Sequence, residues 1–162
     1  MRVRNAGTED APFGAGMHPY FSVGADAPGD VSAAELSVPA RTALVLEGGL
    51  PTGDTRPFDG AIGRIGDLPI DTAVTDLVRD DDGWARTRLS GPAGALTVAV
   101  DGAWRWLQVY TGDTLPADQR RRSVAVEPMT CPPNALADEA DVLVVAPGET
   151  WSGSWTCAWT PA

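Results

Sequence analysis

Glycine and proline recur so often along this sequence that no long amphipathic helix fits between them. The 162 residues include 18 Gly and 14 Pro, and both residue types interrupt helices. No uninterrupted stretch shows the 3.6-residue apolar period of a helix, whereas apolar and polar residues often alternate with a period of two. The chain is therefore predicted to consist mainly of short β-strands.

Seven alternating segments are expected to form strands, and turn sequences such as DDDG (80–83) and SGPAG (90–94) separate them. In the segment 95–100, for example, Leu96, Val98 and Val100 share one face. Short strands at a spacing of roughly 8–12 residues predict an antiparallel β-sandwich or barrel. The segments are 41–47, 84–90, 95–100, 104–111, 123–127, 142–147 and 150–160.

The two ends of the chain raise separate expectations. Trp151, Trp155 and Trp159 share one face of the last predicted strand, which favours core positions for all three. Residues 3–5, with the sequence VRN, are predicted to belong to a strand at the very start of the chain. Because a strand needs a neighbour, we expect that the partner of this strand is missing.

Length and charge favour a single acidic domain over residues 1–162. The formal net charge is −10, which opposes binding to nucleic acid, because that affinity comes largely from basic residues at phosphates. All twelve basic residues are Arg. They are scattered except for the run 120–122, which we expect to form a solvated turn and not a phosphate site.

The cysteines and the start of the chain indicate a cellular compartment. Cys131 and Cys157 form no CxxC motif and the chain has one histidine, so neither a disulfide nor a metal site is expected. The first ten residues lack the apolar run of a secretory signal, and no segment is apolar enough to span a bilayer. We expect a reduced, cytoplasmic protein with buried thiols and no membrane partner.

Common catalytic motifs are absent, and GAIGRIG (60–66) has the wrong glycine spacing for a dinucleotide site. Three polar residues in unusual surroundings remain as candidates. His18 lies in the stretch GMHPYF, Glu127 ends a predicted strand just before a proline, and Asp71 lies within an apolar segment. Each has an ordinary explanation: a structural histidine, a solvated carboxylate and a turn residue. Spacing alone does not decide between these explanations and a functional site.

Six segments resemble the aldose 1-epimerase (galactose mutarotase-like) family in order and rough spacing. They are NAGTEDAPFGAGMHPYF, LPTG, LPIDTAVTDL, LQVYTGDTLP, AVEPMTCPPNAL and VLVVAPGETWSGSW. The resemblance covers nearly the whole chain but only the C-terminal half of the family domain. It implies a partial galactose mutarotase-like domain over residues 1–162, an antiparallel β-sandwich whose N-terminal strands are missing and which carries a sugar cleft.

The resemblance also implies roles for the three candidates. His18 matches the general acid at the sugar ring oxygen, Glu127 the general base at the anomeric hydroxyl, and Asp71 an acid that binds sugar hydroxyls. The implied reaction interconverts the α and β anomers of a free aldohexose such as galactose or glucose. It needs no metal or cofactor, because an imidazole is a serviceable acid at neutral pH and a glutamate is a ready base.

This sequence departs from the family pattern in one respect. Family members supply a further histidine and an arginine from their N-terminal half, and this chain has no second histidine. We therefore expect weak turnover or none from this chain alone. Three alternatives stay open: a hexose-6-phosphate epimerase of the same fold, a non-catalytic carbohydrate-binding sandwich, and a remnant that self-associates through exposed sheet edges.

Overall fold

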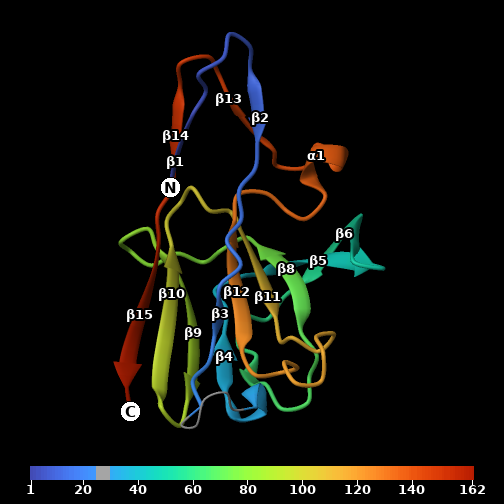
Figure 1. Ribbon diagram of the computed structural model, residues 1–162, viewed down its shortest axis with the longest axis vertical. Helices are drawn as coiled ribbons and strands as arrows, with labels where there is room; N and C mark the ends of the chain where they lie inside the picture. Colours follow the sequence, from blue (N-terminus) through green and yellow to red (C-terminus); the bar gives the residue numbers. More distant parts are fainter. Residues whose placement is uncertain (25–29) are drawn as a thin grey trace.

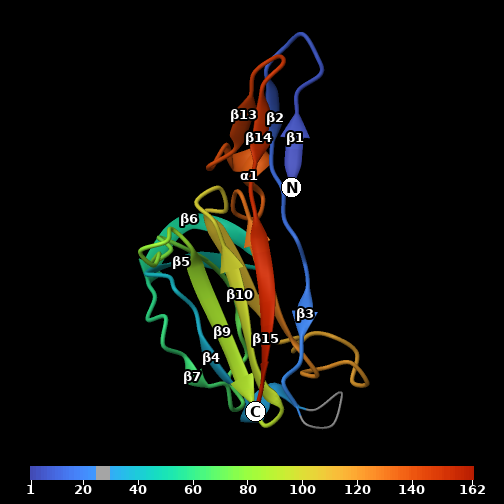
Figure 2. The ribbon, with the colours of Figure 1, turned by 90° about the vertical axis from the view of Figure 1, so that its left-hand side faces the viewer.

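A computed structural model describes residues 1–24 and 30–162 (Figures 1 and 2), and strands make up most of its regular structure. The elements are β1 (Arg2–Arg4), β2 (Ala11–Phe13), β3 (Tyr20–Phe21), the 3₁₀ helix η1 (Val31–Ala33), β4 (Glu35–Ser37), β5 (Thr42–Glu47), β6 (Leu50–Pro57), β7 (Gly63–Arg64), β8 (Asp71–Thr75), β9 (Ala85–Gly91), β10 (Gly94–Val100), β11 (Trp106–Tyr110), β12 (Val124–Met129), α1 (Ala135–Asp138), β13 (Leu143–Val145), β14 (Thr150–Ser152) and β15 (Trp155–Pro161).

Two antiparallel sheets enclose the core, which confirms the predicted antiparallel β-sandwich. One sheet has the order β3-β12-β11-β8-β5-β6 and the other the order β15-β10-β9-β4-β7. Alternate residues of each strand point inward: Val124 and Val126 of β12 and Val98 and Val100 of β10 all belong to one buried cluster. The opposite face of the six-stranded sheet, called the open face below, carries the polar residues of interest.

The first and last parts of the chain meet beyond one end of the sandwich (Figure 1). There β1 pairs with β14 and β2 pairs with β13, all antiparallel. Val3 lies opposite Trp151 in this register, and the Trp151 ring packs 5.4 Å from that of Phe13. The expectation that the first strand lacks its partner is therefore wrong, because the returning C-terminal segment supplies one.

The C-terminal segment forms two strands in different sheets and not the single strand predicted from its alternation. Gly153 lies between them, and a β-carbon there would meet the Trp151 ring at 2.7 Å, so only glycine fits without a shift. Trp151 and Trp155 pack against the core. Trp159 is 47% exposed, so its predicted core position is wrong. The reason is that β15 is the edge strand of its sheet and pairs only with β10.

Two further expectations about side-chain burial are also wrong. Cys157 is exposed on the edge strand β15, whereas Cys131 is half-buried. In the basic run 120–122 the outer two arginines are exposed, but only 13% of the Arg121 side chain is accessible and it pairs with Asp113. Within the described residues, every helix is too short or too polar to cross a bilayer.

Candidate active site

The candidate site lies on the open face, where β12, β11 and β8 run side by side. Because side chains alternate between faces, the register places Glu127 of β12 opposite Gln108 of β11 on this face. One step along, Tyr110 of β11 lies opposite Asp71 of β8. The strands thereby gather two carboxylates, an amide and a phenol from distant parts of the chain.

His18 is carried by an extended segment that runs alongside β12 before β3 begins. Backbone hydrogen bonds fix the segment on both sides of the histidine: Met17 N donates to Pro128 O at 3.0 Å, and Val126 N donates to Pro19 O at 3.4 Å. Residue 18 is therefore held opposite residue 127. The His18 Nε2 atom lies 3.1 Å from Glu127 Oε1.

Glu127 lies within its strand and not at the strand end that the following proline suggested, since β12 continues to Met129. The residue is only 8% exposed. Burial, and to a lesser degree the negative charge of Asp71, raises the pKa of Glu127 to about 7. This carboxyl group therefore exchanges its proton near neutral pH and not near the ordinary glutamate value of about 4.3.

Asp71 is exposed at the first position of β8, and its side chain accepts a hydrogen bond of 2.5 Å from Gln108 Nε2. This contact assigns the amide orientation and leaves Gln108 Oε1 buried without a hydrogen-bond partner among the described residues. Sequence reasoning placed Gln108 in the predicted strand 104–111 but did not select it as a site residue. The sequence signal that could have identified Gln108 was a single amide side chain among aromatic and apolar neighbours.

Two tyrosines form an aromatic wall beside the histidine. The Tyr20 ring stacks on His18 with centroids 5.0 Å apart, and Tyr110 meets Tyr20 edge-on at 6.5 Å. Desolvation, followed by the charges of Tyr110, Glu127 and Asp71, raises the pKa of Tyr20, so this phenol stays neutral at physiological pH. An aromatic face of this kind can pack against the C–H groups of a sugar ring.

A cavity of about 440 Å³ adjoins the site beyond Met129, where β12 ends. It is lined mainly by apolar groups of two loops, including Gly14, Gly16, Cys131, Pro132 and Leu136. No group of three or more His, Cys, Asp or Glu side chains in residues 1–24 and 30–162 is placed to hold a metal ion.

The structure thus brings the three predicted residues to one face of one sheet. His18 and Glu127 are in direct contact, and Asp71 is close enough for its charge to act on Glu127. Their assignment as acid, base and sugar ligand stays a prediction. Chemically, an imidazole and a carboxylate of near-neutral pKa in contact can accept and donate protons on a ligand that reaches both.

Comparison with known proteins identifies related chains. Residues 1–157 match the sequence model of the aldose 1-epimerase family. The uncharacterized protein YihR of Escherichia coli (strain K12) is 29% identical over 156 residues, which cover 90% of this chain and 46% of YihR.

Solved structures show the same fold. A galactose mutarotase-like protein from Clostridium acetobutylicum superposes with a TM-score of 0.79 at 17% identity, over 99% of this chain and 51% of its own length. The GalM/aldose epimerase homologue from C. elegans gives 0.76 at 15% identity, over 94% and 52%. The chain spans about half the length of these relatives.

Proposed function

The chain belongs to the aldose 1-epimerase family, and from that premise we propose that it interconverts the α and β anomers of a free aldohexose. The observation that carries the proposal is the 3.1 Å contact between His18 Nε2 and Glu127 Oε1 on the open face. Family membership implies a sugar substrate. Opening and closing a hemiacetal ring needs one acid and one base, which this pair can supply.

In the proposed reaction, Glu127 accepts the proton of the C1 hydroxyl while protonated His18 donates a proton to the ring oxygen. The bond between C1 and the ring oxygen breaks, and C1 becomes a carbonyl carbon. Rotation about the C1–C2 bond then presents the other carbonyl face. Ring closure reverses both transfers: His18 recovers its proton from the C5 hydroxyl and Glu127 returns one to the C1 oxygen, so the protein regains its starting state.

The closeness of His18 and Glu127 suits this reaction. The C1 hydroxyl oxygen and the ring oxygen are bonded to the same carbon, so the acid and the base have to lie side by side. A pKa of about 7 for Glu127 also suits a group that accepts and returns a proton in each cycle, because such catalysis is most efficient when the pKa lies near the working pH.

The neighbouring side chains would hold the sugar. Asp71, with Gln108 donating to it, offers a carboxylate to sugar hydroxyls. The Tyr20 ring, stacked on His18, offers a flat apolar surface to the pyranose.

Measurement of anomer exchange tests the proposal. We would follow the appearance of β-galactose from α-galactose by a coupled assay, with sugar binding measured separately by titration. We expect slow turnover compared with a full-length relative, loss of that turnover in His18→Asn and Glu127→Gln, and retained binding. Glu35→Gln is the matched control, because Glu35 is an exposed carboxylate on β4 in the other sheet.

The alternatives give different results in the same assay. A non-catalytic binding module would bind the sugar but produce no rate above that of the buffer. A hexose-6-phosphate epimerase would act on glucose 6-phosphate far faster than on glucose. Either result would overturn the proposal that free aldohexoses are the substrates of this site.

A further inference from the structure

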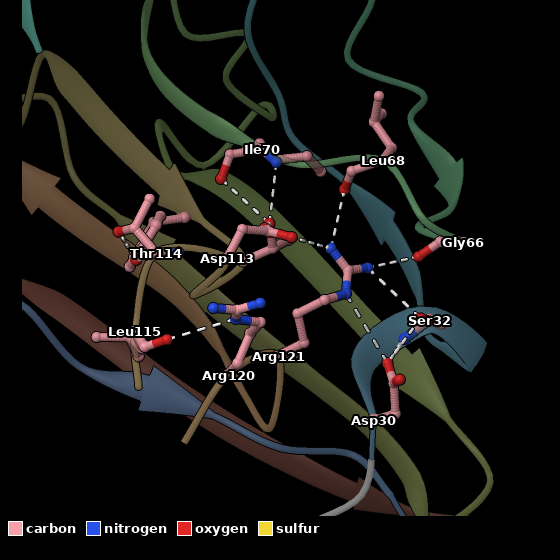
Figure 3. Close-up of polar contacts among 12 residues, drawn as sticks. Asp30, Ser32, Gly66, Leu68, Ile70, Asp113, Thr114, Leu115, Arg120 and Arg121 are labelled. Carbon is pink, nitrogen blue, oxygen red and sulfur yellow. Dashed lines mark hydrogen bonds and ion pairs between the residues drawn. The ribbon is translucent and has the colours of Figure 1, made fainter. Parts of the chain in front are cut away.

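Arg121 is a mostly buried arginine with no part in the proposed acid–base chemistry (Figure 3). Its side chain is 13% accessible, and its Nη1 atom lies 2.7 Å from Asp113 Oδ1. The residue also adopts a left-handed backbone conformation with φ of 54°, and its guanidinium lies between loops that are far apart in sequence. Its other polar contacts are the backbone oxygens of Gly66 and Leu68, the Ser32 hydroxyl and the Asp30 carboxylate.

Asp113 connects Arg121 to Thr111. Thr111 directly follows β11 and is fully buried. The Thr111 hydroxyl donates to the Asp113 carboxylate and accepts a hydrogen bond of 2.9 Å from Ile70 N. Thr111 N in turn donates to Ile70 O at 2.9 Å. Burial alone would raise the pKa of Asp113, but the hydrogen bonds from Thr111 and Arg121 outweigh it and hold the pKa below its usual range. Asp113 therefore stays charged at neutral pH.

The two residues fixed in this way adjoin the candidate site. Ile70 immediately precedes Asp71, and Thr111 immediately follows Tyr110, the register partner of Asp71. The Tyr110 hydroxyl is held from the same loop, since it lies 2.7 Å from Thr114 Oγ1. The Asp71 side chain is exposed. Its backbone is set by the pairing of Asp71 with Tyr110 and, one residue earlier on the same side, by the Thr111–Ile70 hydrogen bonds.

We propose that Arg121 and Asp113 are positioning residues that act through Thr111 and Ile70 to hold Asp71 and Tyr110 in place on the open face. The inference rests on the proposed function, in which Asp71 binds sugar hydroxyls. Arg121 and Asp113 then support the sugar site from outside, and neither side chain touches the sugar. Without the Arg121–Asp113 pair, the start of β8 is free to shift and Asp71 leaves its place beside Glu127.

Glu127 provides a readout that a purely structural role would not move. The titratable groups placed against its carboxyl group are His18, Asp71 and Tyr20, and Asp71 is the one that adjoins the Arg121 network. A shift of Asp71 away from the site lowers the pKa of Glu127 toward the value in an Asp71→Asn variant. Carbon-13 NMR titration of the Glu127 carboxyl group measures this in the intact chain, whether or not the chain turns over sugar.

The test compares Arg121→Gln and Asp113→Asn with Arg120→Gln, a neighbouring exposed arginine whose one side-chain hydrogen bond goes to Leu115 O. In the first two variants we expect a lower pKa for Glu127 and a roughly fivefold rise in KM for galactose, the size expected for one lost hydrogen bond, with kcat changed by less than about twofold. Arg121→Lys should change the Glu127 pKa and KM less than Arg121→Gln does, because lysine keeps the positive charge but lacks the planar guanidinium with its several N–H donors. Arg120→Gln should match wild type.

The proposal is wrong if Arg121→Gln or Asp113→Asn lowers the thermal unfolding midpoint while the Glu127 pKa stays at its wild-type value. Asp113→Asn scarcely changes the size of the side chain. It therefore tests the proposal by itself if Arg121→Gln does not fold. Absence of mutarotation in wild type, with the Glu127 pKa still shifted in the variants, would contradict the proposed function and leave the positioning role of Arg121 supported.

Discussion

The imidazole of His18 and the carboxylate of Glu127 lie 3.1 Å apart, yet 57% of the histidine side chain is accessible to solvent and only 11% of the glutamate side chain. The buried carboxylate has lost most of its water, whereas the imidazole keeps contact with solvent. A proton can therefore leave or reach the pair through the histidine.

The raised pKa of Glu127 predicts the acidic limb of the pH–rate profile. The base has to be deprotonated, so kcat/KM should rise with pH through about 7 and not near the ordinary glutamate value of about 4.3. Asp71→Asn removes the second cause of the shift and should move the limb to lower pH. Initial rates of anomer exchange between pH 4 and 9 check this, and a limb near pH 4.5 in wild type would contradict it.

The same shift predicts how stability depends on pH. The folded-state pKa of Glu127 is raised from 4.5 to about 7, so its stabilising effect is full below pH 4.5 and is lost as pH rises through 7. Glu127→Gln should therefore match wild type near pH 4 and be more stable near pH 8, by about 3 kcal/mol. Urea unfolding at both pH values measures this difference. Glu35→Gln, from an exposed position, should show no such pH dependence.

The fold was largely predictable from the sequence because two-residue alternation reports which face of a strand is buried. Val124 and Val126, for example, lie in the core as their spacing indicates. Alternation cannot show which strand lies at a sheet edge, so the predicted core position of Trp159 is wrong: β15 is an edge strand on which Trp155 packs against the core but Trp159 is exposed. The proline after Glu127 was equally misleading as a sign of the strand end. Pro128 stays in the strand because its carbonyl oxygen, which accepts a hydrogen bond from Met17 N, is the only backbone group that it has to pair.

The candidate site was predictable only in part. His18, Glu127 and Asp71 lie in unusual motifs, so their chemistry was visible in the sequence. The importance of Gln108 and Arg121 depends on register and on loop packing, which no local pattern encodes. Three consecutive arginines have no periodicity that distinguishes the buried one from its exposed neighbours.

Gln108 should contribute to sugar binding through Asp71. Its amide donates to the Asp71 carboxylate at 2.5 Å, so Gln108→Leu leaves that carboxylate without its orienting partner. We expect KM for galactose to rise roughly fivefold, as for one lost charge-assisted hydrogen bond, with a much smaller change in kcat. Gln119→Leu, at an exposed loop position, is the control, and equal effects of the two substitutions on KM would argue against this role.

The edge strand β15 should promote self-association. It pairs only with β10, and the exposed Trp159 and Cys157 lie on it. Open strand edges pair with other chains, and a lysine on such an edge discourages this. We expect sedimentation velocity to show association that increases with protein concentration and decreases in Trp159→Lys. A wild-type chain that stays monomeric at high concentration would contradict this expectation.

Gly14 should be needed because the loop that leads to His18 packs tightly against Cys131. A β-carbon at Gly14 would lie 2.7 Å from Cys131 Sγ, closer than van der Waals contact permits, so Gly14→Ala should destabilise the fold by about 1–3 kcal/mol. Cys131→Ala removes the obstructing sulfur. In the double variant, most of the destabilisation caused by Gly14→Ala should therefore disappear, giving a coupling energy of at least about 1 kcal/mol by urea unfolding.

Gly102→Ala, where a β-carbon meets nothing within 4 Å, should show no coupling to Cys131. Additive free energies in the Gly14–Cys131 cycle would mean that the loop avoids the sulfur by moving, and would predict a displaced His18.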